Sequence, residues 1–310
     1  MEAPLALRRQ VRLDLLCDHR ATTNDFKAFV ASQRYTPSTM GGVFMLCPYV
    51  GDELVSAISG DCSKFGRAAC ETIAGLSTEP KAPKSAAWFV IRSYYAGFYS
   101  AHAFLRLFGR TCTNLDGAEL VKLKEAASAF GQPPPGKGFY KIKISGNQQN
   151  LEFEKLKNSH EDTWATLYKL LGELREAAAT VAAPKMSRDK TVQMLSDLRE
   201  TMSCNGRFEN GNYLSFVRNQ VQYRFAEQTW YPYGSKTFPP PVTAEEIARS
   251  VLEGRYQRLA GSNELVRFIN ASLEFVQLTL NLIDFSAGRG TSASTHLHRD
   301  YRRVRNVYAG

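Results

Sequence analysis

Residues 86–109 read "AAWFVIRSYYAGFYSAHAFLRLFG" and predict a long helix from about Ser85 to Phe108. Apolar side chains recur there at every third or fourth position, which places them on one face of a helix. A face of this width can pack into a core. Its members are Trp88, Ile91, Tyr94, Phe98, Ala101, Leu105 and Phe108. The stretch therefore predicts a fold built on helices.

A second stripe runs beside the apolar face of this helix. Its spacings of three and four residues place its side chains in one row, made of Arg92, Tyr95, Tyr99, His102 and Arg106. A plain solvent-facing row would hold more lysine and glutamate, so the mixture suits a lined groove or a helix–helix interface. The alternative interpretation is an amphipathic core helix with a polar seam.

Most other long segments also show the helical period, whereas alternating strand patterns are scarce. We expect two short helices within residues 2–32 and capped helices that begin near Ser159 and Thr243. The apolar run 43–47 fits either a strand or the buried start of a helix. Three consecutive prolines make residues 131–138 a loop, and "FYKIKIS" after it predicts a strand or hairpin arm. The helix near Ser159 has an apolar stripe at Leu167, Leu170, Leu171 and Leu174.

The expected fold class is mainly α, a helical bundle with extra N-terminal helices, a small β-hairpin insertion and a flexible basic C-terminal tail. A Pro- and Lys-rich connector at 77–84 suggests the first boundary. We assign an N-terminal helical extension to residues 1–80 and the bundle to residues 81–287. The insertion lies near 130–150, and the tail spans 288–310.

The net charge of the chain is +9 and its isoelectric point is near 9.2, which favours a polyanionic partner. No apolar window is long enough for a membrane helix, and three arginines occupy the place of a signal-peptide core, so we expect a cytoplasmic protein with no membrane contact. The six cysteines lack the spacing of zinc or redox pairs. His296 and His298 have no further ligands nearby in the sequence, so we predict no metal. The glycines near 131–138 do not form a P-loop and no dinucleotide fingerprint is present, so we predict no cofactor.

The stretch "RNQVQYRF", residues 218–225, combines an arginine, an amide and a tyrosine. Arg218 and Tyr223 are five residues apart and diverge by about 140° on an ideal helix. They could converge on one phosphate if the helix bends or if a second copy of the chain supplies the other group. The alternative interpretation is a structural helix in which Asn219 and Tyr223 form a hydrogen-bonded pair.

Together these two stretches resemble the HEPN superfamily of prokaryotic helical-bundle proteins. "RSYYAGFYSAHAFL" is similar to the Tyr-Tyr-Ala helix of that family, and "RNQVQYRF" resembles its signature of an arginine, a polar residue and a later histidine. The resemblance covers about residues 85–110 and 210–230. It implies a helical bundle, commonly dimeric, that cleaves RNA without metal in antiphage defence or a toxin–antitoxin system. Arg218 would hold the phosphate, and Asn219 would occupy the polar position.

The chain departs from the signature where the shortest version expects histidine, because Tyr223 stands there. None of the five histidines follows Arg218 at the required distance. The phenol of tyrosine, with a pKa near 10, is a poor base at neutral pH. We therefore predict a catalytic set of Arg218, Asn219 and Tyr223, with His102 as the first candidate for the proton carrier.

The remaining predictions concern RNA contacts and partners. The RNA-binding residues would be Arg92, Tyr99, Arg106, Arg224, Arg302 and Arg303. The family also implies a homo-oligomer, or a protein partner such as a nucleotidyltransferase that modifies a tyrosine near the motif, or another defence-system subunit. Three hypotheses stay open: a metal-independent endoribonuclease, a non-catalytic RNA-binding or interaction subunit, and a purely structural bundle.

Overall fold

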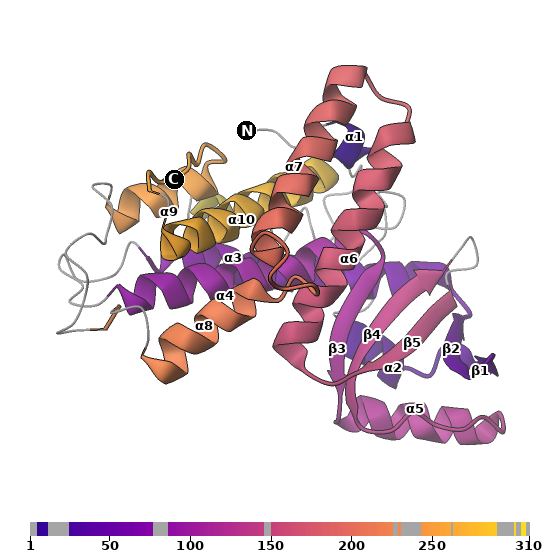
Figure 1. Cartoon of the computed structure of the whole chain (residues 1–310). Helices are drawn as coiled ribbons and strands as arrows, with labels where there is room; N and C mark the ends of the chain where they lie inside the picture. Colours follow the sequence, from indigo (N-terminus) through magenta and orange to yellow (C-terminus); the bar gives the residue numbers. More distant parts are fainter. Residues whose placement is uncertain are drawn as a thin grey trace.

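Helix α4 (Ala87–Leu107) lies at the centre of the computed structural model, packed between α3 (Gly51–Ala74) and α10 (Glu264–Arg289) (Figure 1). The apolar face of α4 is buried at Ile91, Tyr94 and Phe98, as the periodicity predicts. Trp88 is the exception, because its side chain is 51% exposed in the first turn of the helix. The structure describes residues 5–11, 25–76, 86–145, 150–225, 229–230, 243–261, 263–289, 301 and 305–307.

The other helices surround this central layer. Helices α6 (Ser159–Thr180) and α7 (Lys185–Ser203) form an antiparallel hairpin, and α8 (Tyr213–Arg224) packs against α4, α6 and α7 (Figure 1). Helix α9 (Ala244–Leu252) begins with the predicted capping box of Thr243 and Glu246, which is confirmed. The cap of α6 is Asn158, one residue before the predicted Ser159. Helix α1 (Leu5–Arg8) is a single turn beside α7.

A five-stranded antiparallel sheet lies at one end of the helical layer, in the order β1-β2-β5-β4-β3 (Figure 1). Its strands are β1 (Tyr35–Met40), β2 (Val43–Pro48), β3 (Arg110–Leu115), β4 (Gly138–Ser145) and β5 (Asn150–Leu156). Helices α2 (Phe26–Ala31) and α5 (Ala118–Ala129) pack against each other, and α5 also contacts β1.

The sheet corrects the prediction of a small hairpin insertion. The expected hairpin is present as β4 and β5, but β2 extends it through the pair Phe44–Phe153, and β1 and β3 form its edges. The apolar run at 43–47, which fitted either a strand or the start of a helix, is strand β2. Gly41 and Gly42, at φ 58° and 78°, make the two-residue turn between β1 and β2, a conformation that glycine adopts at little cost.

The described part of the C-terminal tail is packed against the helices, contrary to the prediction of a flexible tail. Tyr301 is fully buried and lies close to Gly66 of α3. The Arg305 guanidinium donates hydrogen bonds to the Leu252 carbonyl oxygen at the end of α9 and forms an ion pair with Asp284. A cation is favourable at a helix C-terminus, where carbonyl oxygens lack partners. Among the helices of the described ranges, none is long and apolar enough to cross a lipid bilayer.

Candidate active site at Arg218 and His160

Arg218 lies on the side of α8 that faces α4 and α6, and its side chain is only 6% exposed. One guanidinium nitrogen, Nη1, donates a hydrogen bond of 2.7 Å to Asn219 Oδ1. The other, Nη2, lies 3.2 Å from the hydroxyl of Tyr95 on α4. The predicted neighbours Arg218 and Asn219 are thus in contact, and the row on α4 contributes Tyr95.

A histidine also contacts this guanidinium, and it is His160. Its Nε2 atom lies 2.9 Å from Arg218 Nη2. His160 stands in the first turn of α6, where the Asn158 side chain caps the helix and accepts a hydrogen bond from the His160 backbone N–H. The Phe98 ring of α4 stacks on the imidazole at a centroid distance of 4.4 Å. The structure therefore brings His160, which precedes Arg218 in the chain, into contact with Arg218.

The hydrogen bonds define which nitrogen of His160 carries its proton. An arginine can only donate, so His160 Nε2 must accept from Arg218. The proton is then on Nδ1, which lies 2.9 Å from the Tyr94 hydroxyl. Trp164 Nε1 also donates to that hydroxyl, at 3.1 Å. His160 consequently presents the lone pair of Nε2 to Arg218, which is the form a general base requires.

Burial of the imidazole, and then the nearby Arg218 charge, lower the pKa of His160 to about 4. Burial raises the pKa of Tyr94 to about 12, so its phenol keeps its proton at neutral pH. The pair at pH 7 is therefore a charged guanidinium beside a neutral imidazole.

The charge of Arg218 is not neutralised within the described part of the chain. No described carboxylate lies within ion-pair distance of it. The guanidinium carbon instead lies 5.3 to 5.6 Å from the ring centroids of Tyr94, Tyr95 and Tyr223, within the range of cation–π attraction. Because a cation largely withdrawn from water is costly without a counter-ion, this arrangement favours binding of an anion.

Tyr223 reaches this site in spite of the expected divergence on α8. Its ring lies 5.4 Å from the Arg218 guanidinium carbon and is 62% exposed. The two side chains are long enough to bridge five residues without a second copy of the chain. Tyr95, His160 and Asn219 are half-buried and so more exposed than Arg218, whereas Tyr94 beneath it is fully buried.

His102, the histidine that the sequence favoured, lies elsewhere. It is buried between α3 and α4, stacked on Phe65 at 4.6 Å, and burial holds its pKa well below the usual value. The Phe98 ring contacts both imidazoles, at 4.8 Å for His102 and 4.4 Å for His160. The Arg218 nitrogens bond to His160 and not to His102. His102 is therefore a neutral histidine of the core.

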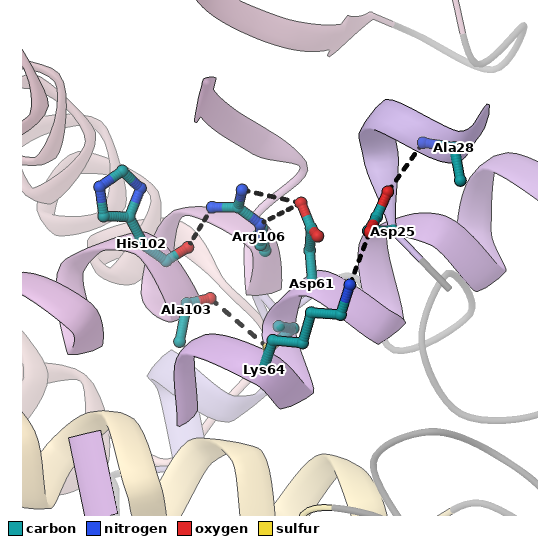
Figure 2. A network of polar contacts seen from close by, with 8 residues as sticks. Asp25, Ala28, Asp61, Lys64, His102, Ala103 and Arg106 are labelled. Atoms are coloured by element: carbon teal, nitrogen blue, oxygen red, sulfur yellow. Dashed lines mark hydrogen bonds and ion pairs between the residues drawn. The ribbon is translucent and has the colours of Figure 1, made fainter. Parts of the chain in front are cut away.

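Arg106 is also inside the protein, with 2% of its surface exposed. Figure 2 shows its guanidinium directed at the Asp61 carboxylate of α3, with hydrogen bonds of 3.2 and 2.9 Å, while the His102 carbonyl oxygen accepts a third at 2.9 Å. The guanidinium also lies over the Phe65 ring at 4.4 Å. The predicted RNA contact of Arg106 is not available in this conformation, because its donors are used within the core.

The other predicted RNA-binding residues have different surroundings. Arg92 is half-buried and donates to the Gly75 carbonyl oxygen at the end of α3. Tyr99 is half-buried, 6.3 Å from Tyr95 between ring centroids. Arg224 is exposed at the last residue of α8. Arg302 and Arg303 lie outside the described residues.

Sequence reasoning missed His160, Tyr94 and Trp164 as parts of this site. Tyr94 and Tyr95 both lie in the stretch "RSYYAGFYSAHAFL", but the apolar periodicity assigned Tyr94 to the core. The sequence offered one hint of His160: it is a histidine in the first turn of a capped helix. Among the described residues, no three His, Cys, Asp or Glu side chains gather as a metal site. Comparisons with protein-family models, curated proteins and solved structures return no match to this chain.

Proposed function

We propose that this protein is a HEPN-like endoribonuclease that cleaves RNA without a metal ion, and that Arg218 and His160 carry the reaction. The single observation behind the proposal is the 2.9 Å contact between a buried, uncompensated guanidinium and a neutral imidazole. One group can hold a phosphate and stabilise its developing charge, and the other can accept a proton. Tyr223 then needs no role as a base.

In the proposed reaction, the phosphate of RNA takes the Arg218 donors and so frees His160 Nε2. That nitrogen accepts the proton of the ribose 2′-hydroxyl, and the 2′ oxygen attacks phosphorus. The bond from phosphorus to the 5′ oxygen breaks, and this oxygen takes a proton from water; the hydroxide that is left takes the proton that His160 accepted. The products are a 2′,3′-cyclic phosphate and a 5′-hydroxyl end. Tyr94 and Trp164 act as positioning residues, because they hold the imidazole in the required tautomer.

A non-catalytic RNA-binding subunit is the second candidate. The observation that favours it is the burial of Arg218, whose two terminal nitrogens already have partners within the chain. Both candidates keep the family's expectations of a defence or toxin–antitoxin setting and of a homo-oligomer or protein partner. Since one chain supplies both Arg218 and His160, the proposed chemistry does not require a second protomer.

The test is cleavage of RNA by the purified chain in EDTA. We expect cyclic phosphate and 5′-hydroxyl ends, and a rate about 100-fold lower for Arg218→Ala, because a lost electrostatic donor typically costs this much. Arg218→Lys keeps the positive charge but loses the forked donor geometry of the guanidinium. It therefore tests whether the charge alone is enough for cleavage. Thermal unfolding must show that each variant folds. Intact RNA with retained, salt-sensitive binding supports the non-catalytic subunit; no binding and no cleavage contradicts both candidates.

The pH dependence gives a second prediction. Because the base must be unprotonated and the pKa of His160 in the free protein is about 4, kcat/KM stays high as the pH falls from 7 to 5 and declines only near 4. In Arg218→Gln, the pKa of His160 rises, since the neighbouring charge is gone, but burial keeps it below the usual value. Nuclear magnetic resonance of the imidazole nitrogens measures both the titration and the Nδ1–H tautomer. An acidic limb near 6.5, equal in both proteins, would rule the assignment out.

A further inference from the structure

An exposed aromatic cluster, which we call the platform, joins the start of α4 to the end of α8. The ring of Trp230 lies 5.6 Å from those of both Trp88 and Phe225, edge to face in each case. Trp88 is 51% exposed and Phe225 67% exposed, whereas Trp230 is half-buried between them. Large aromatic rings gain free energy from burial, so a group of three that remains largely in water suggests a binding surface.

The platform is held in place by backbone contacts. Trp230 Nε1 donates a 2.7 Å hydrogen bond to the Val221 carbonyl oxygen of α8, and the Ala87 N–H of α4 donates to the Thr229 carbonyl oxygen at 3.1 Å. Phe225 ends α8 in the left-handed conformation, with φ 52° and ψ 27°, which is uncommon for a residue other than glycine. These contacts tie Trp230 and its neighbour Thr229 to α8 and α4, so part of the platform is already positioned when a ligand binds.

The platform continues into the Arg218 site. Trp88 and Tyr95 are seven residues apart on α4, so they share one face and lie about 10 Å apart along the axis. That separation matches about three nucleotides of a stacked strand, at roughly 3.4 Å each. On α8, Tyr223 contacts Arg218 and the platform residue Phe225 follows two positions later. A strand whose phosphate sits at Arg218 could therefore place neighbouring bases on the platform.

We propose that Trp88, Phe225 and Trp230 form a stacking subsite for the unpaired bases of single-stranded RNA that flank the phosphate held at Arg218. The inference rests on the proposed function for the position of that phosphate. Aromatic rings stack on any base whose face is free, and base faces are free only outside a duplex. The subsite thus selects single strands and is tolerant of sequence.

Charge favours RNA over a protein partner as the occupant. The exposed Arg224 lies between Tyr223 and Phe225 in the chain, Arg218 has no described carboxylate partner, and the chain as a whole carries +9. Aromatic rings interleaved with arginines form the usual lining of a single-strand groove. A homodimer interface is the rival occupant, and the experiment separates the two.

The experiment measures binding of a fluorescein-labelled 12-nucleotide single strand with 2′-O-methyl groups, which cannot be cleaved, by anisotropy. The double variant Trp88→Ala/Phe225→Ala should bind at least about 10-fold more weakly, a loss typical of stacked bases. Its salt dependence should be unchanged, because no phosphate contact is removed. The matched control is Phe130→Ala, a partly exposed ring at the end of α5. An abasic strand should bind wild type and the double variant equally.

Binding and cleavage are scored separately. Weaker binding of the double variant supports the platform even if wild type does not cleave RNA. A failure of the proposed activity can therefore be told apart from a failure of the platform. Equal binding by the double variant overturns the inference even if wild type cleaves. Equally tight binding of a duplex of the same length also overturns it. A fall in sedimentation mass of the double variant, with RNA binding intact, identifies the platform as a protein interface and overturns it as well.

Discussion

If the proposed RNA cleavage is correct, replacing His160 with alanine should lower its rate in EDTA by about 100- to 10,000-fold, the usual contribution of a general base. The reason is the basic lone pair on Nε2, because the other groups that accept from Arg218, the Asn219 amide oxygen and the Tyr95 hydroxyl, are poor bases at neutral pH. The imidazole also contacts Phe98 and Tyr94, so its loss should cost some stability, and thermal unfolding must show that the variant folds. Single-turnover rates with excess protein measure the chemical step directly.

Two controls make this result specific to His160. His102→Gln changes a neutral core histidine and should leave the rate within a few-fold of wild type, once the folded fraction is matched. Tyr223→Phe removes the hydroxyl but keeps the ring over Arg218, and should also retain most activity. Full activity in His160→Ala, or loss of activity in Tyr223→Phe alone, would show that the base is assigned to the wrong residue.

Removal of Asp61 should produce the largest loss of stability. Asp61→Ala leaves the Arg106 guanidinium, which is 2% exposed, without its carboxylate partner between α3 and α4 (Figure 2). An uncompensated buried charge of this kind typically costs about 3–5 kcal/mol. Urea unfolding, followed by the fluorescence of the buried Trp164, measures the change in the free energy of unfolding.

The ion pair of Asp25 and Lys64 provides a matched control, because it lies close to Asp61 but is partly exposed (Figure 2). Lys64→Ala should cost less than about 1 kcal/mol. The double variant Asp61→Leu/Arg106→Met removes both charges and should recover most of the loss. If Asp61→Ala unfolds at the same urea concentration as Lys64→Ala, the buried pair contributes nothing beyond a surface pair, and our interpretation of this core is wrong.

The helical elements were largely predictable from the sequence. The helix predicted from Ser85 to Phe108 is observed as Ala87–Leu107, the box of Thr243 and Glu246 caps α9, and the stripe of four leucines in α6 is buried. Each of these features depends on residues within one or two turns of each other, so local spacing is enough to predict it. Trp88 was assigned to the wrong environment, since periodicity does not tell where the neighbouring helices end.

The sheet was only partly predictable. The alternation in "FYKIKIS" predicted β4, and the Gly41–Gly42 pair was a signal for the β1–β2 hairpin that we overlooked. The pairing of β2 with β5 joins residues more than a hundred positions apart, such as Phe44 and Phe153. No local pattern encodes such a register, because it depends on which strands the surrounding helices bring together.

By itself the sequence determined the helices of this protein, their caps and buried stripes, and its positive charge. The HEPN resemblance and the RNA activity remain predictions. Only the tertiary structure decided that His160 meets Arg218, that His102 and Arg106 belong to the core, and that Trp88 is exposed beside Trp230. The physical reason is separation along the chain. Helical periodicity depends on residues a few positions apart, whereas the partner of a polar side chain depends on how helices distant in the sequence pack together.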